Sequence, residues 1–128
     1  MIQYGAMQHY DWNLLEEEPL NPLLGRKMMH GQNVTVARIR LRTGAVVPLH
    51  SHPNEQISMV ESGALRFTIS GEERVLRAGE AGEAVVIPPD APHMVEALED
   101  SLAVDLFSPP REDWIRGDDA YLRDAANR

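Results

Sequence analysis

Two histidines, His50 and His52, stand two residues apart in the stretch HSHPNEQISMVESG. In an extended strand, residues two apart project to the same side, so both imidazoles face one way. The same parity adds Gln56 to this face rather than Glu55, unless a bulge at Pro53 exchanges the two. Imidazole, amide and carboxylate groups are all metal ligands, so this face is a candidate metal site.

A third histidine, His93, follows a turn in PPDAPHMVEA and stands at the head of the next short strand. A lone histidine on a strand is usually a surface or hydrogen-bonded residue, and that interpretation stays open for each of the three. The chain contains no cysteine. Disulfides, thiolate nucleophiles and cysteine-based zinc sites are therefore excluded, and a metal must be held by His, Asp, Glu, Gln or Asn.

A candidate proton-transfer group lies in the stretch SLAVDLF, where Asp105 shares a strand face with Ala103 and Phe107. If the opposite, aliphatic face packs outward, Asp105 points into the protein. An unpaired carboxylate there is costly, so Asp105 needs a partner or has a function. A buried salt bridge and an exposed acid at the rim are the alternatives to a catalytic role.

Arg111 follows two prolines in FSPPREDW. Its planar fork of donors matches a carboxylate, and beside a metal it would complete a positive pocket for an anionic ligand. The alternative is a surface ion pair with Glu112 or Asp113.

The elements that position these residues are short strands, because nine glycines and nine prolines interrupt segments rich in β-branched and aliphatic residues. About eight strands are expected, which favours an all-β jelly-roll barrel. The clearest segments are Val34–Leu41, Ala64–Ser70, Gly71–Glu80 with Gly71 beginning a tight turn, Glu83–Pro89, and Ser101–Phe107.

Only the two ends suggest helix. Asp11–Gly25 has a cap candidate at Asn13, but Pro19 and Pro22 limit it to one or two turns. A short helix is expected around Asp118–Asp124. We predict one domain over residues 1–128, with a core at about 33–108 and terminal segments that pack on the barrel or on a partner subunit.

Length and charge restrict the partners. A chain of 128 residues fits a single domain, and a formal net charge of −8 opposes binding to a nucleic acid. No apolar window approaches the length that spans a bilayer, and the opening MIQYGAMQHYDWN lacks the pattern of a signal peptide. We therefore expect a cytoplasmic protein without a membrane or nucleic-acid partner.

The histidine stretches resemble the two cupin motifs. The first motif is matched by Gly44, His50, His52, Gln56 and Gly63, and the second by Gly82, Pro88 and His93. The chain departs from the second motif at Asp90, where glycine is usual, and at Ala97, where asparagine is frequent. The resemblance implies a cupin (RmlC-like) jelly roll in which one metal ion is held by His50, His52, Gln56 and His93.

All four implied ligands are neutral when bound, so a divalent ion would keep most of its charge. Such a centre should attract an anionic substrate and act as a Lewis acid. Ligand type does not distinguish Ni, Zn, Fe, Mn and Co, so we predict one divalent transition metal ion without naming it.

The run DLFSPPREDW, with HSHPNEQIS and VIPPDAPHMVEALEDS, resembles the KdgF-type cupins of pectin and alginate breakdown, with a likeness from about Asp11 to Arg123. That resemblance implies catalytic roles for Asp105 and Arg111 and substrate binding by Phe107 and Arg111. It implies metal-dependent conversion of 4,5-unsaturated uronate monosaccharides, which are small sugar acids, to linear keto forms.

Two other functions stay open. One is a different metal enzyme on a small anion, such as a dioxygenase or isomerase. The other is a cupin that binds or senses a small anion without turnover. Small cupins commonly dimerise through edge strands and terminal segments, so a homodimer is expected.

Overall fold

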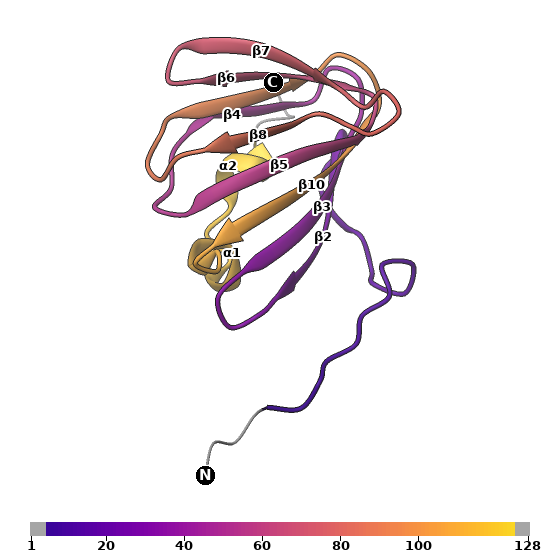
Figure 1. Ribbon diagram of the computed structural model, residues 1–128, viewed down its shortest axis with the longest axis vertical. Coiled ribbons are helices and arrows are strands. Elements are labelled where there is room, and N and C mark those ends of the chain that lie inside the picture. The colour runs from indigo at the N-terminus through magenta and orange to yellow at the C-terminus, as the bar shows by residue number, and fades with distance from the viewer. Residues whose placement is uncertain (1–4, 125–128) are drawn as a thin grey trace.

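The computed structural model describes residues 5–124, which form two facing antiparallel sheets and two short helices (Figure 1). The six-stranded sheet has the order β1 (Glu18–Asn21), β2 (Leu24–His30), β3 (Thr35–Leu41), β10 (Ser101–Ser108), β5 (Glu55–Ser62) and β8 (Ala84–Ile87). The four-stranded sheet has the order β4 (Val46–His50), β9 (His93–Ala97), β6 (Ala64–Ile69) and β7 (Glu72–Arg77). The helices are α1 (Glu112–Arg116) and α2 (Ala120–Asp124). The predicted all-β jelly-roll fold is confirmed.

Strand β3 shows how alternation in the sequence builds the inner face. Its side chains alternate between buried and more exposed positions, and Ala37 and Leu41 are almost fully buried. Strand β10 pairs with every residue of β3, and Asp105 lies opposite Ala37. Because Ala103 and Phe107 of β10 are also buried, the inner face of the six-stranded sheet is mostly apolar with Asp105 among its residues.

The predicted core of residues 33–108 is too short at its start, because β1 and β2 precede it in the six-stranded sheet. Strand β1 was missed because Pro19 argues against a strand. Here β1 is the edge strand, where the missing proline N–H removes no bond that the sheet interior needs. Strand β2 was missed because LGRKMMH does not alternate between apolar and polar residues.

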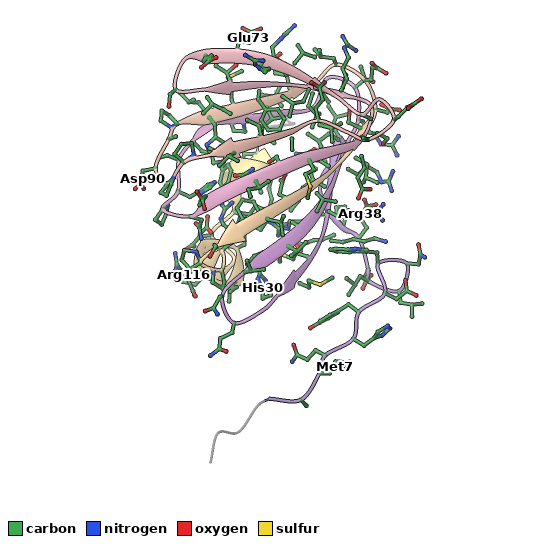
Figure 2. All side chains as sticks on the ribbon, viewed as in Figure 1. Met7, His30, Arg38, Glu73, Asp90 and Arg116 are labelled. Atoms are coloured by element: carbon green, nitrogen blue, oxygen red, sulfur yellow. The ribbon has the colours of Figure 1, made fainter. Side chains whose placement is uncertain are left out.

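The two ends behave differently. At Asp11 a single turn forms, in which the amides of Leu14 and Leu15 donate to the Asp11 carbonyl. The Asp11 carboxylate, rather than the predicted Asn13 side chain, caps this turn by accepting from the Asn13 amide. The segment before it leads away from the barrel, and Met7 is 92% exposed (Figures 1 and 2). Residues 1–4 and 125–128 of the predicted domain lie outside the described residues.

Helix α2 falls within the predicted Asp118–Asp124, whereas α1 was not expected. Helix α2 contacts β1 and β4, which are edge strands of the two sheets, and so closes one side of the jelly roll. Neither helix in residues 5–124 is long and apolar enough to cross a membrane.

At two motif positions the backbone leaves no room for a side chain, which explains the glycines there. Gly63 has a φ of +82°, and a Cβ there would collide with the Asp100 carbonyl oxygen. Gly82 has a φ of +81°, and its Cβ would lie 2.7 Å from the Val60 carbonyl oxygen. The predicted tight turn between β6 and β7 begins at Ser70, one residue before Gly71, because both adopt positive φ as a two-residue hairpin turn requires.

Candidate functional site

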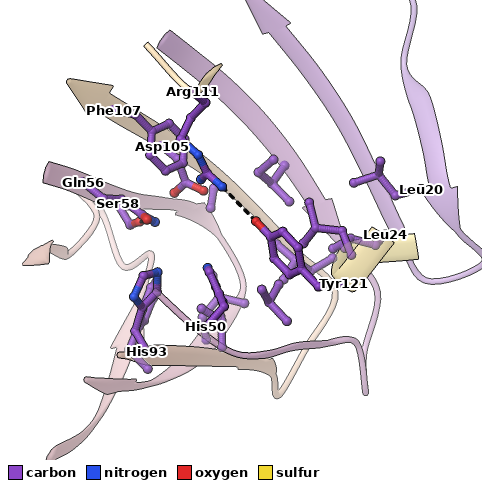
Figure 3. A pocket seen from close by; sticks show the side chains of 18 of the residues that line it. Leu20, Leu24, His50, Gln56, Ser58, His93, Asp105, Phe107, Arg111 and Tyr121 are labelled. Carbon is purple, nitrogen blue, oxygen red and sulfur yellow. Dashed lines mark hydrogen bonds between the residues drawn. The ribbon is translucent and has the colours of Figure 1, made fainter. Parts of the chain in front are cut away.

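The space between the sheets holds a cavity of about 50 Å³, closed on one side by the segment from Arg111 to Leu122. Apolar side chains from both sheets form most of its wall, and the polar groups that reach it are His50, Gln56, Ser58, His93, Asp105, Arg111 and Tyr121 (Figure 3).

The three motif histidines meet beside this cavity. Each offers a nitrogen atom, and these atoms lie within 4.8 Å of one another. His50 ends β4 and His93 begins β9, and the two residues pair directly across the four-stranded sheet. His52 lies in the loop after β4, so strand parity, from which it was predicted, does not place it. The loop places it, because the His52 carbonyl accepts from the Asp90 amide at 2.8 Å.

Asp90 stands where the second cupin motif usually has glycine, and it adopts a φ of +64°. Aspartate tolerates this left-handed conformation better than most residues, so the turn forms without glycine. The Asn54 side chain adds a second tie by donating to the carbonyls of Pro109 and Pro110. The His52 loop is thus held from two directions.

Hydrogen bonds fix which histidine nitrogen is available. Nδ1 of His50 lies 2.7 Å from the Pro48 carbonyl, Nδ1 of His52 lies 3.1 Å from the Asn54 carbonyl, and Nδ1 of His93 lies 2.8 Å from the Ala91 carbonyl. Because a carbonyl only accepts, each Nδ1 carries the proton and each Nε2 keeps a free lone pair.

Nε2 of His93 is buried without a hydrogen-bond partner among the described residues. A buried lone pair beside two others is what a metal ion would satisfy. The three histidines therefore fit a metal site, although they do not identify the ion.

Burial also keeps the imidazoles neutral. It lowers the pKa of His50 and the pKa of His52 to about 4, against a smaller opposing effect of their hydrogen bonds to backbone carbonyls. It lowers the pKa of His93 as well. Neutral imidazole is the form that binds a metal, so the site is in its ligand form at neutral pH.

Gln56 faces the histidines. Its Oε1 lies 3.0 Å from Nε2 of His52, and its Nε2 donates to the Ser58 hydroxyl at 2.8 Å. Glu55 is exposed on the other side of β5. The arrangement is the one expected without a bulge, so the amide rather than the carboxylate reaches the histidine cluster.

Asp105 reaches the cavity from β10 and stands near Ser58 and Arg111 (Figure 3). No salt bridge to Asp105 occurs within residues 5–124. Burial raises the pKa of Asp105 to about 6, while the Ser58 hydroxyl and the Arg111 charge act in the opposite direction. A carboxyl group with such a pKa can both give and take a proton near neutral pH.

Arg111 is 1% exposed, so it is not the surface residue that the alternative interpretation supposed. Its fork does engage Asp113, with Nε and Nη2 donating to the two carboxylate oxygens at 2.9 and 2.8 Å. The guanidinium lies 4.7 Å from the Phe107 ring and 4.1 Å from the Trp114 ring. Stacking and the ion pair together hold Arg111 beside the cavity.

Phe107 lines the cavity and packs edge-on against His52, at 5.7 Å between ring centroids, and against Trp114 at 5.0 Å. It therefore joins the histidine cluster to the arginine.

Two site residues were missed by sequence reasoning, Trp114 and Tyr121. The Tyr121 ring lies 4.8 Å from the His50 ring, and its hydroxyl accepts from Arg111. They lie in short helices outside both motifs, so neither strand parity nor motif spacing signals them. The one signal in the sequence is the presence of two aromatic residues, Trp114 and Tyr121, after Arg111, which indicates that this segment packs against the rest of the protein.

Comparison with known proteins agrees with this geometry. The model of the cupin domain family matches residues 37–108, more than half of the chain. The pectin degradation protein KdgF of Dickeya dadantii is 35% identical over 79 residues, which cover 60% of this chain and 69% of that protein.

Two solved structures have the same fold. The structure of KdgF from Halomonas sp. matches with a TM-score of 0.78 and 32% identity, covering 85% of this chain and 99% of that one. An RmlC-like cupin from Shewanella frigidimarina matches with a TM-score of 0.78 and 26% identity, covering 85% and 96%. With its two motifs, its jelly roll and its cluster of three histidines, this chain belongs to the cupin family and is a KdgF-like cupin.

Proposed function

We propose that this chain is a metal-dependent enzyme that converts 4,5-unsaturated uronate monosaccharides into linear keto forms during the breakdown of pectin- or alginate-type polysaccharides. The observation that carries the proposal is that a cluster of three neutral histidines lies beside the cavity that Asp105 and Arg111 line. The likeness to the pectin degradation protein KdgF supports the choice of substrate class.

The reaction is an isomerisation. A ring carbon–oxygen bond breaks, the ring oxygen becomes a ketone at carbon 5, and carbon 4 gains the proton that the anomeric hydroxyl loses. No oxidant, reductant or second substrate is consumed. The protein must therefore hold a carboxylate and move one proton.

Arg111 is suited to hold the carboxylate. Asp113 and Tyr121 engage its Nε and Nη2, and within residues 5–124 no hydrogen bond engages Nη1. The pair with Asp113 fixes the guanidinium plane, so Nη1 is oriented before a ligand arrives. Phe107, beside Arg111, offers an apolar surface to the sugar ring.

Asp105 is suited to move the proton. Burial gives it a pKa of about 6, so its protonated and ionised forms are both accessible near neutral pH. It lines the same cavity as Arg111, which lets a substrate bound by the arginine place its double bond near this carboxyl group.

The metal would be held by His50, His52 and His93, with Gln56 as a fourth neutral ligand. When bound, it would supply Lewis acidity. The residues of the cavity do the rest: they orient the carboxylate, exclude bulk water and carry the proton.

The test follows the ultraviolet absorbance of a 4,5-unsaturated monouronate mixed with the purified protein under anaerobic conditions. We expect the absorbance of the conjugated double bond to disappear with wild-type protein and to persist after chelation. Restoring single ions, namely Ni, Zn, Fe, Mn or Co, to the chelated sample then identifies the active metal. A metal-loaded protein that leaves the absorbance unchanged would overturn the proposal.

A further inference from the structure

Tyr121 carries the one hydroxyl of α2, and nothing in the cupin motifs assigns it a role. We propose that the Tyr121 O–H is a substrate-binding donor that holds the uronate carboxylate together with Arg111. This inference rests on the proposed function for the identity of the ligand, and it adds a residue that determines specificity for an anion.

The phenol oxygen of Tyr121 accepts two hydrogen bonds. This oxygen accepts from Nη2 of Arg111 at 2.9 Å and from Nε1 of Trp114 at 3.2 Å. Both partners are N–H donors that cannot accept. The two lone pairs of the oxygen are thus used, and its own hydrogen must be donated elsewhere. Within residues 5–124 no acceptor takes it.

The position of the Tyr121 ring also favours contact with a ligand in the cavity. Tyr121 lines the cavity, and its ring lies 4.8 Å from the ring of His50 (Figure 3). Its hydroxyl end is bonded to Arg111. The side chain therefore reaches from the histidine cluster to the arginine, and a ligand that lies between them meets its O–H.

Contacts of the neighbouring residues hold Tyr121 in place. The next residue, Leu122, accepts through its carbonyl from the Asn21 side chain at 2.7 Å. Two residues earlier, Asp119 is 2% exposed and pairs with the buried Arg26 at 2.8 Å. Contacts to β1 and β2 thus fix the short helix on both sides of the tyrosine, so the hydroxyl is positioned before a ligand binds.

The chemistry favours a carboxylate. Arg111 offers the N–H groups of Nη1, and Tyr121 offers its O–H. The two side chains are neighbours, because Nη2 of Arg111 donates to the phenol oxygen at 2.9 Å. Two neighbouring donors suit a group with two acceptor oxygens and a negative charge. A neutral sugar hydroxyl could accept from both donors, but it lacks the negative charge that strengthens a hydrogen bond from a guanidinium.

The test compares Tyr121→Phe with wild type in calorimetric titrations with galacturonate. This sugar acid has the carboxylate but lacks the carbon 4–5 double bond, so it is not converted. Phenylalanine keeps the ring on His50 and removes only the hydroxyl. Because a hydrogen bond to a charged group is lost, we expect the dissociation constant to rise about tenfold to hundredfold.

Kinetics with the unsaturated uronate separate binding from structural damage. A donor that holds the carboxylate throughout the reaction changes KM and leaves kcat within about twofold. Metal content measured on the same sample should stay at the wild-type level. The matched control is Tyr10→Phe, which removes a hydroxyl from an exposed tyrosine of the N-terminal segment and should change nothing.

The outcomes separate this inference from the proposed function. If wild type converts the unsaturated uronate and Tyr121→Phe matches it in affinity and KM, the inference is wrong and the function stands. If wild type binds galacturonate through Tyr121 but converts nothing, the inference stands and the function fails. If wild type neither binds nor converts uronates, both fail. Loss of metal or of kcat in Tyr121→Phe, with unchanged affinity, would assign the tyrosine a structural role instead.

Discussion

Nε2 of His52 lies 3.0 Å from Oε1 of Gln56. The Gln56 oxygen only accepts, and Nδ1 of His52 already donates its proton to the Asn54 carbonyl. In this orientation two acceptors face each other at hydrogen-bond distance, while the amide nitrogen of Gln56 donates to the Ser58 hydroxyl. Such a contact is repulsive unless a positive charge joins it. Since burial holds the pKa of His52 near 4, a metal ion rather than a proton is the expected charge at neutral pH.

The first prediction concerns that ion. Purified wild-type protein should contain about one divalent transition ion per chain by elemental mass spectrometry. His93→Ala removes a proposed metal ligand. The affinity of this variant for the metal should fall by more than the roughly 10- to 100-fold loss that is typical when a hydrogen-bond partner of a ligand is removed. His9→Ala, at an exposed histidine outside both motifs, should keep the ion. Equal metal content in both variants would contradict the site.

Asp105→Asn tests the proton-transfer group. The amide has nearly the same shape but cannot exchange a proton, so kcat on the unsaturated uronate should fall by roughly 10²-fold or more. Metal content should be unchanged, since Asp105 is not one of the residues proposed to hold the ion. Asp124→Asn, an exposed acid at the end of α2, is the matched control. A kcat within twofold of wild type would remove Asp105 from the mechanism.

The acid stability of the chain should depend on Asp119. Burial alone would raise the pKa of Asp119, but hydrogen bonds and charges from Arg123 and Arg26 outweigh it and hold that pKa below its usual range. A depressed pKa stabilises the folded state at every pH above the unfolded value of about 3.9, and this stabilisation is lost as the pH falls through the folded value. As the pH falls below about 4, the free energy of unfolding should therefore decrease less for Asp119→Asn than for wild type.

Urea unfolding of the chelated proteins between pH 7 and pH 3 measures this difference. At pH 7 Asp119→Asn should be less stable by about 3 kcal/mol, because it leaves Arg26 buried with one partner fewer. The neighbouring Asp118→Asn, at an exposed pair with Arg116, should stay within about 0.5 kcal/mol. Parallel stability curves for wild type and Asp119→Asn would show that the ion pair does not govern acid unfolding.

The homodimer stays a prediction, and the outer face of the six-stranded sheet offers a place for a second copy. Val36, Leu106, Ile57 and Val86 form a row of paired positions across four strands, and Val86 is 57% exposed. Light scattering should give twice the 14.3 kDa chain mass. Val86→Lys should halve it, because it places a charge in an apolar contact, whereas Glu72→Lys on the other sheet should not. A wild-type monomer at micromolar concentration would end this prediction.

Much of the fold could be predicted because alternation in the sequence is local. Strand β3 and strand β10 carry it clearly, and both lie where it placed them. Strands β1 and β2 could not be found in this way. Pro19 is tolerated only at the edge of the sheet, and Arg26 in the run LGRKMMH is buried because it pairs with Asp119 and stacks on Trp114 of the C-terminal segment. Which strand lies at an edge is a property of the whole sheet.

The site was predictable only in part, for the same reason. Motif spacing named the three histidines and Gln56, and Asp105 followed from its position in the last strand. His52 shows the limit, because a loop held by Asp90 and Asn54 orients it rather than the parity of a strand. Tyr121 could not be found, since its relation to His50 spans 71 positions in the sequence and exists only after α2 docks.

The stack of Arg111 on Trp114 gives the protein an intrinsic optical reporter. Trp114 is buried, its ring lies 4.1 Å from the guanidinium, and its indole N–H is bonded to the Tyr121 hydroxyl. The other tryptophan, Trp12, lies in the N-terminal segment away from the cavity. In a Trp12→Phe background, all indole emission comes from the residue that contacts both Arg111 and Tyr121, the two side chains proposed to bind the anion. Ligand occupancy can then be followed continuously by fluorescence in solution, without a label and without turnover.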